Sequence, residues 1–528
     1  MNDSTLANGH ALKRFGQHVP DILDCLAQLS NDEVPTPPKL ARAMLDQLPL
    51  DVWSNPELRW LDPCCKSGVL LREAAVRLLE GLATWEPDFV KRREHIFRNM
   101  LFGTSITEMT GNIARRSLYC ARDASSDHSV VRFASEAGNL PFVLSEHRFG
   151  RRKNGTLTAC RICGAPPELE RGSKRENYAY SFIHGGYPTK ELSGMKFDVI
   201  VGNPPYQTED GGHGASSTPI YQHFVEAAID MNPKHVLMIT PSRWFAGGKG
   251  LDKFRARMLK DKHLETLVDY PKLYDCFPGV KIRGGVSYFL WSRDHHGACS
   301  VQTMWEGNPV GEPVKRYLDS YDVLIRRNEA VSILEKVRAA SEDTLEARVS
   351  SRKPFGLATN FHGSDSPDHL SDPVKLYGSQ RISWIEESKI PQNGEWAQEW
   401  KVLMSAVQGT SGSVETQFLG KPIIAAPGEI CTETYLVAGR MPSRDEAELY
   451  AAYLRTRFVR FLVSLRKATQ HATKDVYAFV PAVPLESEWT DELLYARYGL
   501  NEDEISFIES QVKEMLAPDL AAASGSTK

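Results

Sequence analysis

FDVIVGNPPYQ, residues 197–207, is the stretch that decides the fold of this chain. Its apolar middle, Val199-Ile200-Val201, is typical of a strand that is covered on both faces. The two prolines after Asn203 must end the strand, because each fixes φ and lacks a backbone N–H. In open α/β sheets ligands bind at the carboxyl ends of the strands, so the NPPY turn marks the place to look for a site.

Strand-like runs alternate with helical stretches on both sides of this segment. Amphipathic periodicity predicts helices at 70–82 and 252–263. This alternation predicts a doubly wound, parallel α/β sheet. The expected strands are RWLDP (59–63), MLFGTSI (100–106), VVRFAS (130–135), FDVIVGN (197–203), HVLMIT (235–240), LETLVDY (264–270) and GVSYFLW (285–291).

The NPPY turn itself suggests a chemistry. The Asn203 side-chain oxygen and the Pro204 carbonyl can accept both N–H groups of an amine on a planar base, which frees the amine's lone pair for attack on a methyl group. Tyr206 can stack on the base, a contact of about 1–3 kcal/mol. The structural alternative is a stiff strand-to-loop turn, formed with Pro205, and a packing tyrosine.

Together with WLDPCCKSGVLL (60–71) and the proline break VPTPP (34–38), this motif resembles the gamma class of amino-group DNA methyltransferases, especially the Eco57I-like restriction–modification methylases. The resemblance extends over nearly the whole chain. It implies a Rossmann-like class I methyltransferase sheet, S-adenosylmethionine as cofactor, and adenine N6 in double-stranded DNA as substrate. It also implies a C-terminal α+β target-recognition domain and a place in a restriction–modification or phage-defence system.

The resemblance assigns a cofactor pocket, although two positions depart from the family's pattern. Lys66 stands where a glycine is usual and faces either solvent or the cofactor's carboxylate, and Ser105 stands where an acid usually ends the second strand. Taken alone, the DP…SG stretch is also typical of an ordinary strand-to-helix turn. The expected cofactor-binding residues are Thr36, Pro37, Asp62, Pro63, Gly68, Glu108 and Asn203.

A base stacked in a duplex must rotate out of the helix before it can reach this turn. Phe277 in DCFPG resembles the aromatic residue that sandwiches the flipped base against the NPPY tyrosine. Its alternative role is packing in a Phe-Pro turn.

An insertion at 136–196 interrupts the sheet pattern and carries a CxxC pair, the cysteine pair that points to a metal. Cys160 and Cys163 follow a Lys153-Asn154-Gly155 hairpin signal, and a CxxC at a hairpin tip is half of a zinc knuckle. Two further ligands must come from Cys120, His147 or His184, of which we expect Cys120 and His147. The alternative is a pair of packed thiols without metal.

We expect a helical N-terminal segment at 1–50, a methyltransferase domain at 51–295 and a target-recognition domain at 296–528. The last of these contains a local run of positive charge that can clamp DNA phosphates. A solvated amphipathic helix explains the run equally well. The expected DNA-binding residues are Arg455, Arg457, Arg460, Arg466, Lys467 and Lys474.

Composition limits the remaining choices. Lys+Arg 63 against Asp+Glu 67 excludes a chain that coats polyanions indiscriminately, and no apolar run reaches the length of a membrane span. Nine scattered cysteines fit a reducing cytoplasm, so we expect a cytoplasmic protein without a membrane partner. No nuclease motif is visible, so we expect that the chain does not cleave DNA itself and that a restriction nuclease subunit is its partner. The alternatives are a catalytically impaired DNA-specificity subunit, or methylation of cytosine N4, RNA or protein glutamine.

Overall fold

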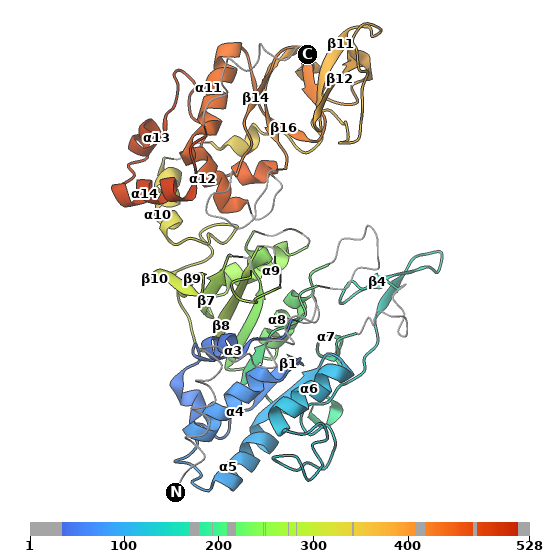
Figure 1. Cartoon of the computed structure of the whole chain (residues 1–528), viewed down its shortest axis with the longest axis vertical. Coiled ribbons are helices and arrows are strands. Elements are labelled where there is room, and N and C mark those ends of the chain that lie inside the picture. Colours follow the sequence, from blue (N-terminus) through green and yellow to red (C-terminus); the bar gives the residue numbers. More distant parts are fainter. Residues whose placement is uncertain are drawn as a thin grey trace, which may run out of the picture. The chain divides into compact units, whose positions relative to one another are not determined.

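The structure is a computed structural model that divides into two compact units, Met1–Asp322 and Val323–Lys528 (Figure 1). Each unit is described by itself. The predicted features at 1–33 and at the C-terminal tail lie outside the described residues. The described residues are 34–167, 179–192, 194–207, 218–246, 248, 250–272, 274–280, 282, 284–340, 343–407, 418–467 and 472–515.

The first unit is built on an 8-stranded mixed sheet with the strand order β10-β9-β7-β8-β6-β5-β1-β2. The neighbours β2, β1, β5 and β6 are parallel, whereas β8 runs antiparallel between β6 and β7. The strands are β1 (Trp60–Cys65), β2 (Leu101–Ser105), β5 (Val199–Gly202), β6 (His235–Pro241), β7 (Leu264–Tyr270), β8 (Val286–Ser292), β9 (Cys299–Trp305) and β10 (Asn308–Arg316).

The alternating α/β pattern is confirmed for six of the expected strands, and every residue of β1, β2, β5 and β8 is buried. The strand expected at 130–135 is wrong. Phe133 turns into the core instead, with its ring 4.9 Å from that of Tyr119. Residues 139–142 take the place beside β2, where the Gly103 and Ser105 amides donate to the Asn139 and Pro141 carbonyls at 3.0 Å.

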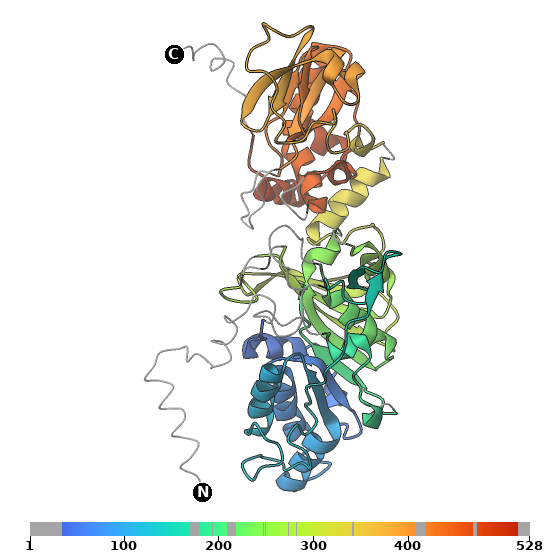
Figure 2. The ribbon, with the colours of Figure 1, turned by 90° about the vertical axis from the view of Figure 1, so that its right-hand side faces the viewer.

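Helices cover this sheet. α3 packs on α4, α4 packs on α6, and α8 packs on β6, and Figure 2 shows the helices of the blue segment beside one another. The predicted helices at 70–82 and 252–263 are confirmed as α4 and α9. The helices are α3 (Pro38–Leu45), α4 (Val69–Gly81), α5 (Phe89–His95), α6 (Glu108–Tyr119), α7 (Ser181–His184), α8 (Tyr221–Asp230) and α9 (Asp252–Lys260), with the short turns η1 (Leu50–Trp53), η2 (Ile96–Met100), η3 (Lys190–Leu192) and η4 (Ser242–Phe245).

The insertion carries the expected hairpin, formed by β3 (Phe149–Arg151) and β4 (Leu157–Cys160). Its turn is closed by Gly155, whose φ of +85° suits glycine. The hairpin leads directly into the CxxC segment.

The second unit contains two three-stranded sheets, β12-β11-β15 and β14-β13-β16. The unit begins later than the expected border at 295, because β9 and β10 extend the sheet of the first unit. Its strands are β11 (Pro373–Gly378), β12 (Arg381–Glu386), β13 (Trp400–Ser405), β14 (Ile423–Ala425), β15 (Glu429–Cys431) and β16 (Tyr435–Met441). Its helices are α10 (Glu329–Ala339), α11 (Arg444–Arg455), α12 (Arg457–Arg466), α13 (Asp491–Arg497) and α14 (Glu502–Gln511), with the turns η5 (Leu345–Ala347), η6 (Glu387–Lys389), η7 (Gly394–Gln398) and η8 (Lys474–Tyr477).

Within the described ranges, no helix combines the length and the apolar character needed to cross a bilayer.

Candidate active site

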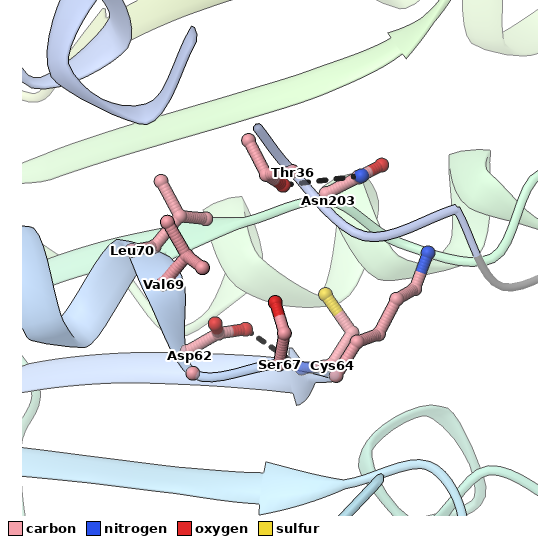
Figure 3. A pocket seen from close by; sticks show the side chains of 9 residues that line it. Thr36, Asp62, Cys64, Ser67, Val69, Leu70 and Asn203 are labelled. Atoms are coloured by element: carbon pink, nitrogen blue, oxygen red, sulfur yellow. Dashed lines mark hydrogen bonds between the residues drawn. The ribbon is translucent and has the colours of Figure 1, made fainter. Parts of the chain in front are cut away.

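The candidate site lies where β1 and β5 end side by side in the sheet. The chain leaves β1 toward β2 on one side and returns as β5 on the other, so this is a switch point, where α/β sheets bind ligands. A narrow pocket opens there (Figure 3) and is lined by Thr36, Asp62, Cys64, Lys66, Ser67, Gly68, Val69, Leu70 and Asn203.

The pocket brings together four of the expected cofactor residues: Thr36, Asp62, Gly68 and Asn203. Pro37, Pro63 and Glu108 are not among its lining residues. Glu108 is exposed in the first turn of α6, so its predicted contact with a ribose stays a prediction.

Asn203 has its two amide atoms in different surroundings. Its Nδ2 donates to the Val34 carbonyl at 2.9 Å and to the Thr36 hydroxyl at 3.2 Å. Its Oδ1 is buried and has no hydrogen-bond partner among the described residues. Because a carbonyl can only accept, Val34 fixes which end of the amide points inward. This role of Val34 could not be predicted from the sequence, since a backbone carbonyl has no side-chain signature.

The NPPY turn continues into an aromatic pair. The Tyr206 carbonyl accepts from the Ile220 amide at 3.3 Å, which fastens the turn to the start of α8. Phe277 lies beside Tyr206, with ring centroids 6.5 Å apart and planes at 67°. The two rings are edge to face, so one ring must turn before a flat base can fit between them.

Asp62 is a buried carboxyl group at the end of β1. It accepts a hydrogen bond from the Cys64 amide at 3.1 Å. Burial is the main cause that raises the pKa of Asp62 to about 6, against the pull of that amide and of Lys66. A cationic ligand group would therefore find a favourable partner here.

Gly68 begins α4 in the left-handed conformation, with φ of +74°. A Cβ at this position would lie 2.9 Å from the Ala114 carbonyl oxygen, so only glycine fits the turn without strain. The glycine thereby brings the backbone close to the pocket.

Lys66 is buried, and the expectation that it faces solvent is wrong. Its Nζ donates to the Val34 carbonyl at 3.2 Å and lies 5.8 Å from the centre of the Tyr206 ring. The lysine therefore joins the turn after β1 to the segment before α3. Its side chain also lines the narrow pocket.

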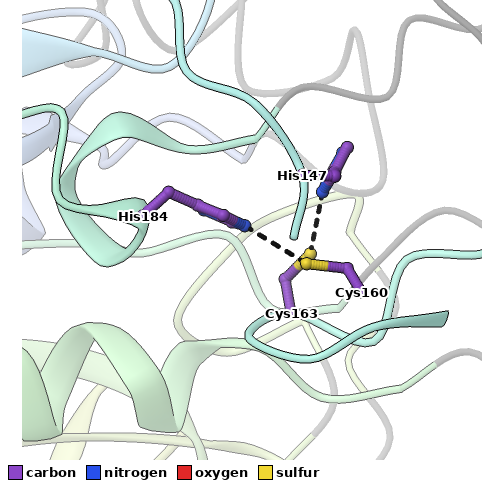
Figure 4. Close-up of side chains that lie close together, drawn as sticks. All are labelled: His147, Cys160, Cys163 and His184. Carbon is purple, nitrogen blue, oxygen red and sulfur yellow. Dashed lines mark hydrogen bonds between the residues drawn. The ribbon is translucent and has the colours of Figure 1, made fainter. Parts of the chain in front are cut away.

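The insertion gathers a second group of side chains: His147, Cys160, Cys163 and His184 (Figure 4). Cys160, Cys163 and His147 were expected. Cys120 is exposed at the C-terminal end of α6 and lies outside this group, so its assignment as a ligand is wrong. His184 takes its place, and no spacing rule in the sequence could select it from the three candidates.

The six basic residues of the second unit do not form one exposed surface. Arg460 is 1% exposed and donates to the carbonyls of Arg455 and Thr456, and burial lowers its pKa to about 10. Lys467 is buried against the Phe418 carbonyl, at 2.8 Å. These two residues are therefore wrong as phosphate contacts, because both side chains are buried and donate to carbonyl groups inside the protein.

Arg457 forms ion pairs with Glu509 at 3.1 Å and Glu514 at 3.6 Å. Lys474 is exposed, and Arg455 and Arg466 are half-buried. The phosphate role of these three residues stays a prediction.

Comparison with known proteins identifies the family of this chain. The Eco57I restriction-modification methylase family matches residues 99–277. An uncharacterized adenine-specific methylase of Mycoplasma pneumoniae is 37% identical over 318 residues, which are 55% of this chain and 74% of that protein. The chain is therefore a methylase and belongs to the Eco57I restriction-modification methylase family.

Solved structures resemble the chain more distantly. The type IIL restriction-modification enzyme MmeI in complex with DNA has 13% identity and a TM-score of 0.48, over 87% of this chain and 69% of that one. The DrdV–DNA complex has 13% identity and a TM-score of 0.45, over 98% of this chain and 63% of that one.

Replacing Asp62 by Asn tests the charge at the pocket. The folded-state pKa of about 6 lies above the ordinary value of 3.8, so the stabilisation from Asp62 is full below pH 3.8 and is lost as the pH rises through 6. We expect Asp62→Asn to melt a few degrees higher than the parent at pH 7.5, since the loss amounts to at most about 3 kcal/mol.

The difference in melting temperature should vanish near pH 4, where the parent carboxyl group is protonated as well. Scanning calorimetry at both pH values measures it. An Asp62→Asn protein that melts below the parent at pH 7.5 would contradict the assigned pKa.

Proposed function

We propose that this chain transfers a methyl group from S-adenosylmethionine to the N6 amine of adenine at a specific sequence in double-stranded DNA. The observation that carries the proposal is the Asn203 side chain, whose buried Oδ1 has no partner among the described residues and whose Nδ2 is tied back. Such an oxygen is a preformed acceptor for an N–H group.

Asn203 would hold the amine together with the Pro204 carbonyl. The two acceptors draw the amine's hydrogens to one side, so the nitrogen's lone pair points away from them. Accepting oxygens that are already in place need no reorganisation during the reaction. Tyr206 would support the base from one face, and Phe277 would close the other after its ring turns.

The residues of the narrow pocket fit S-adenosylmethionine, which supplies an electrophilic methyl group on a sulfonium centre. Asp62 offers a buried carboxylate for an ammonium group, and Gly68, at the start of α4, lines the same pocket. Thr36 lies between this pocket and Asn203. A pocket this narrow must widen to admit the whole cofactor.

Two observations favour catalysis over a DNA-specificity subunit that has lost activity. Lys66 departs from the family's pattern, yet it leaves Asn203 Oδ1 without a partner and bonds to Val34 instead. Ser105, at the end of β2, also has a buried hydroxyl group without a partner among the described residues. A ligand can pair with both groups.

Each of the two units has a proposed role in the enzyme. We assign the first unit as a Rossmann-like class I methyltransferase domain and the second as the target-recognition domain, with Arg455, Arg466 and Lys474 as phosphate contacts. The enzyme would act in the cytoplasm as the modification component of a restriction–modification or phage-defence system, with a nuclease subunit as partner. We assign a structural zinc ion to the insertion.

The direct test is single-molecule sequencing of DNA from cells that express the chain. We expect N6-methyladenine at one recurring sequence. In cells that express Tyr206→Ala at equal level, we expect a much smaller fraction of those sites to be modified, because stacking of about 1–3 kcal/mol is lost. Tyr206→Phe is the matched control, since the Tyr206 hydroxyl has no partner among the described residues.

Methylation of cytosine N4 would overturn the assignment of the base. The absence of any modified base would overturn the proposed function, provided that the protein is folded.

Replacing Thr36 by Val tests how Asn203 is held. The methyl group keeps the shape but removes the acceptor that lies 3.2 Å from Asn203 Nδ2. We expect turnover to fall by about tenfold, the value of one hydrogen bond, and Thr36→Ser to restore it because serine keeps the hydroxyl. Steady-state methyl transfer to the target DNA measures both. Equal turnover for the valine and serine variants would exclude this positioning role.

A further inference from the structure

The four side chains gathered in the insertion have the chemistry and the spacing of a metal site. Two thiols and two imidazoles offer one ligand atom each, and these atoms all lie within 4.8 Å of one another. The two cysteines and His184 are buried, and His147 is half-buried. Two sulfur and two nitrogen ligands in a tetrahedron are typical of zinc.

The two sulfur–nitrogen distances between neighbouring ligands fit a tetrahedron around one ion. Zinc lies about 2.3 Å from sulfur and about 2.0 Å from nitrogen, which places a sulfur and a nitrogen ligand about 3.5 Å apart. Cys160 Sγ lies 3.6 Å from His184 Nε2, and Cys163 Sγ lies 3.3 Å from His147 Nδ1. Figure 4 shows both imidazoles directed at the sulfur atoms.

The surroundings prepare these atoms for a metal. His184 Nδ1 lies 2.9 Å from the Tyr180 carbonyl, and this contact places the ring proton on Nδ1 and leaves Nε2 as the donor that faces the cysteines. Gly164 completes the turn with φ of +72°, and its amide donates to the Cys160 carbonyl at 2.9 Å.

The group also connects the insertion to the turn that holds Tyr206. A Cβ at Gly164 would lie 3.7 Å from the Thr218 side chain, so the CxxC turn rests against Thr218. The neighbouring Pro219 pairs with Gln207, and Ile220 bonds to the Tyr206 carbonyl.

From the other side, His184 ends α7, which packs on α8 through Phe182 and Phe224, with ring centroids 6.0 Å apart. The insertion therefore contacts Thr218 through the CxxC turn and α8 through α7.

We infer that His147, Cys160, Cys163 and His184 bind one Zn²⁺ ion, and that this ion fastens the insertion against Thr218 and α8. All four ligands come from the protein, so the site is closed and structural. The zinc site rests on its own geometry, and only the importance of the fastening for methyl transfer rests on the proposed function.

The first experiment measures metal content by atomic emission on the full chain expressed with zinc. We expect one zinc ion per chain in the parent, loss of it in Cys163→Ser, and full retention in Cys120→Ser, the matched control at an exposed cysteine. Cobalt-substituted parent protein should show the intense visible absorption of tetrahedral thiolate coordination, which needs no variant. A metal-free parent, or a cobalt spectrum without thiolate character, would overturn the site.

The second experiment follows hydrogen exchange of the parent before and after a chelator removes the zinc. We expect faster exchange in the hairpin and at the Ile220 amide, with strands of the second unit unchanged. Faster exchange in the hairpin alone would overturn the fastening while leaving the zinc site in place. Neither result depends on methyl transfer, so a failure here is distinct from a failure of the proposed function.

Discussion

The Asn203 amide is held by its nitrogen, and the rest of the site is arranged around that constraint. Val34 and Thr36 present two acceptors to Nδ2, so Oδ1 must point the other way, into a buried space where no described residue pairs with it. The sheet supplies the other half of the constraint. β5 ends at Gly202, next to β1, and delivers Asn203 to the place where Asp62 and Gly68 line the same pocket.

This arrangement costs stability that a ligand can restore. A buried acceptor without a partner costs about 1–3 kcal/mol, and the Asp62 carboxyl group is disfavoured in its charged form by burial. A bound ligand is one way in which such groups gain a partner. The Val34 carbonyl accepts hydrogen bonds from Asn203 and from Lys66, so the segment before α3 contacts the turns that carry these two residues. A single carbonyl thus couples the turn after β1 to the turn after β5.

Much of the first unit could be predicted from sequence, because buried parallel strands have an apolar signature that survives without context. The stretch VVRFAS was predicted as a strand on similar grounds, but it is an irregular segment in which only Val131 is buried, and only the tertiary structure decides between these outcomes. Within the site, Asn203 and Asp62 were visible because they follow strands directly. Val34 and His184 were not assigned, since their roles arise from contacts between residues far apart in the chain. Arg460 was wrongly predicted to contact DNA. Its position in the sequence is consistent with an exposed helix face, but the structure buries its side chain.

The central claim is that Asn203 Oδ1 accepts the amine of the target base, and Asn203→Ala tests it most directly. The measurement is single-turnover transfer of a labelled methyl group to the target DNA, with cofactor binding followed by calorimetry on the same protein. The account predicts a rate lower by about 100-fold or more, the loss seen when one preorganised polar group is removed, in a protein that still binds the cofactor. Transfer at the parental rate by the folded variant would contradict the account.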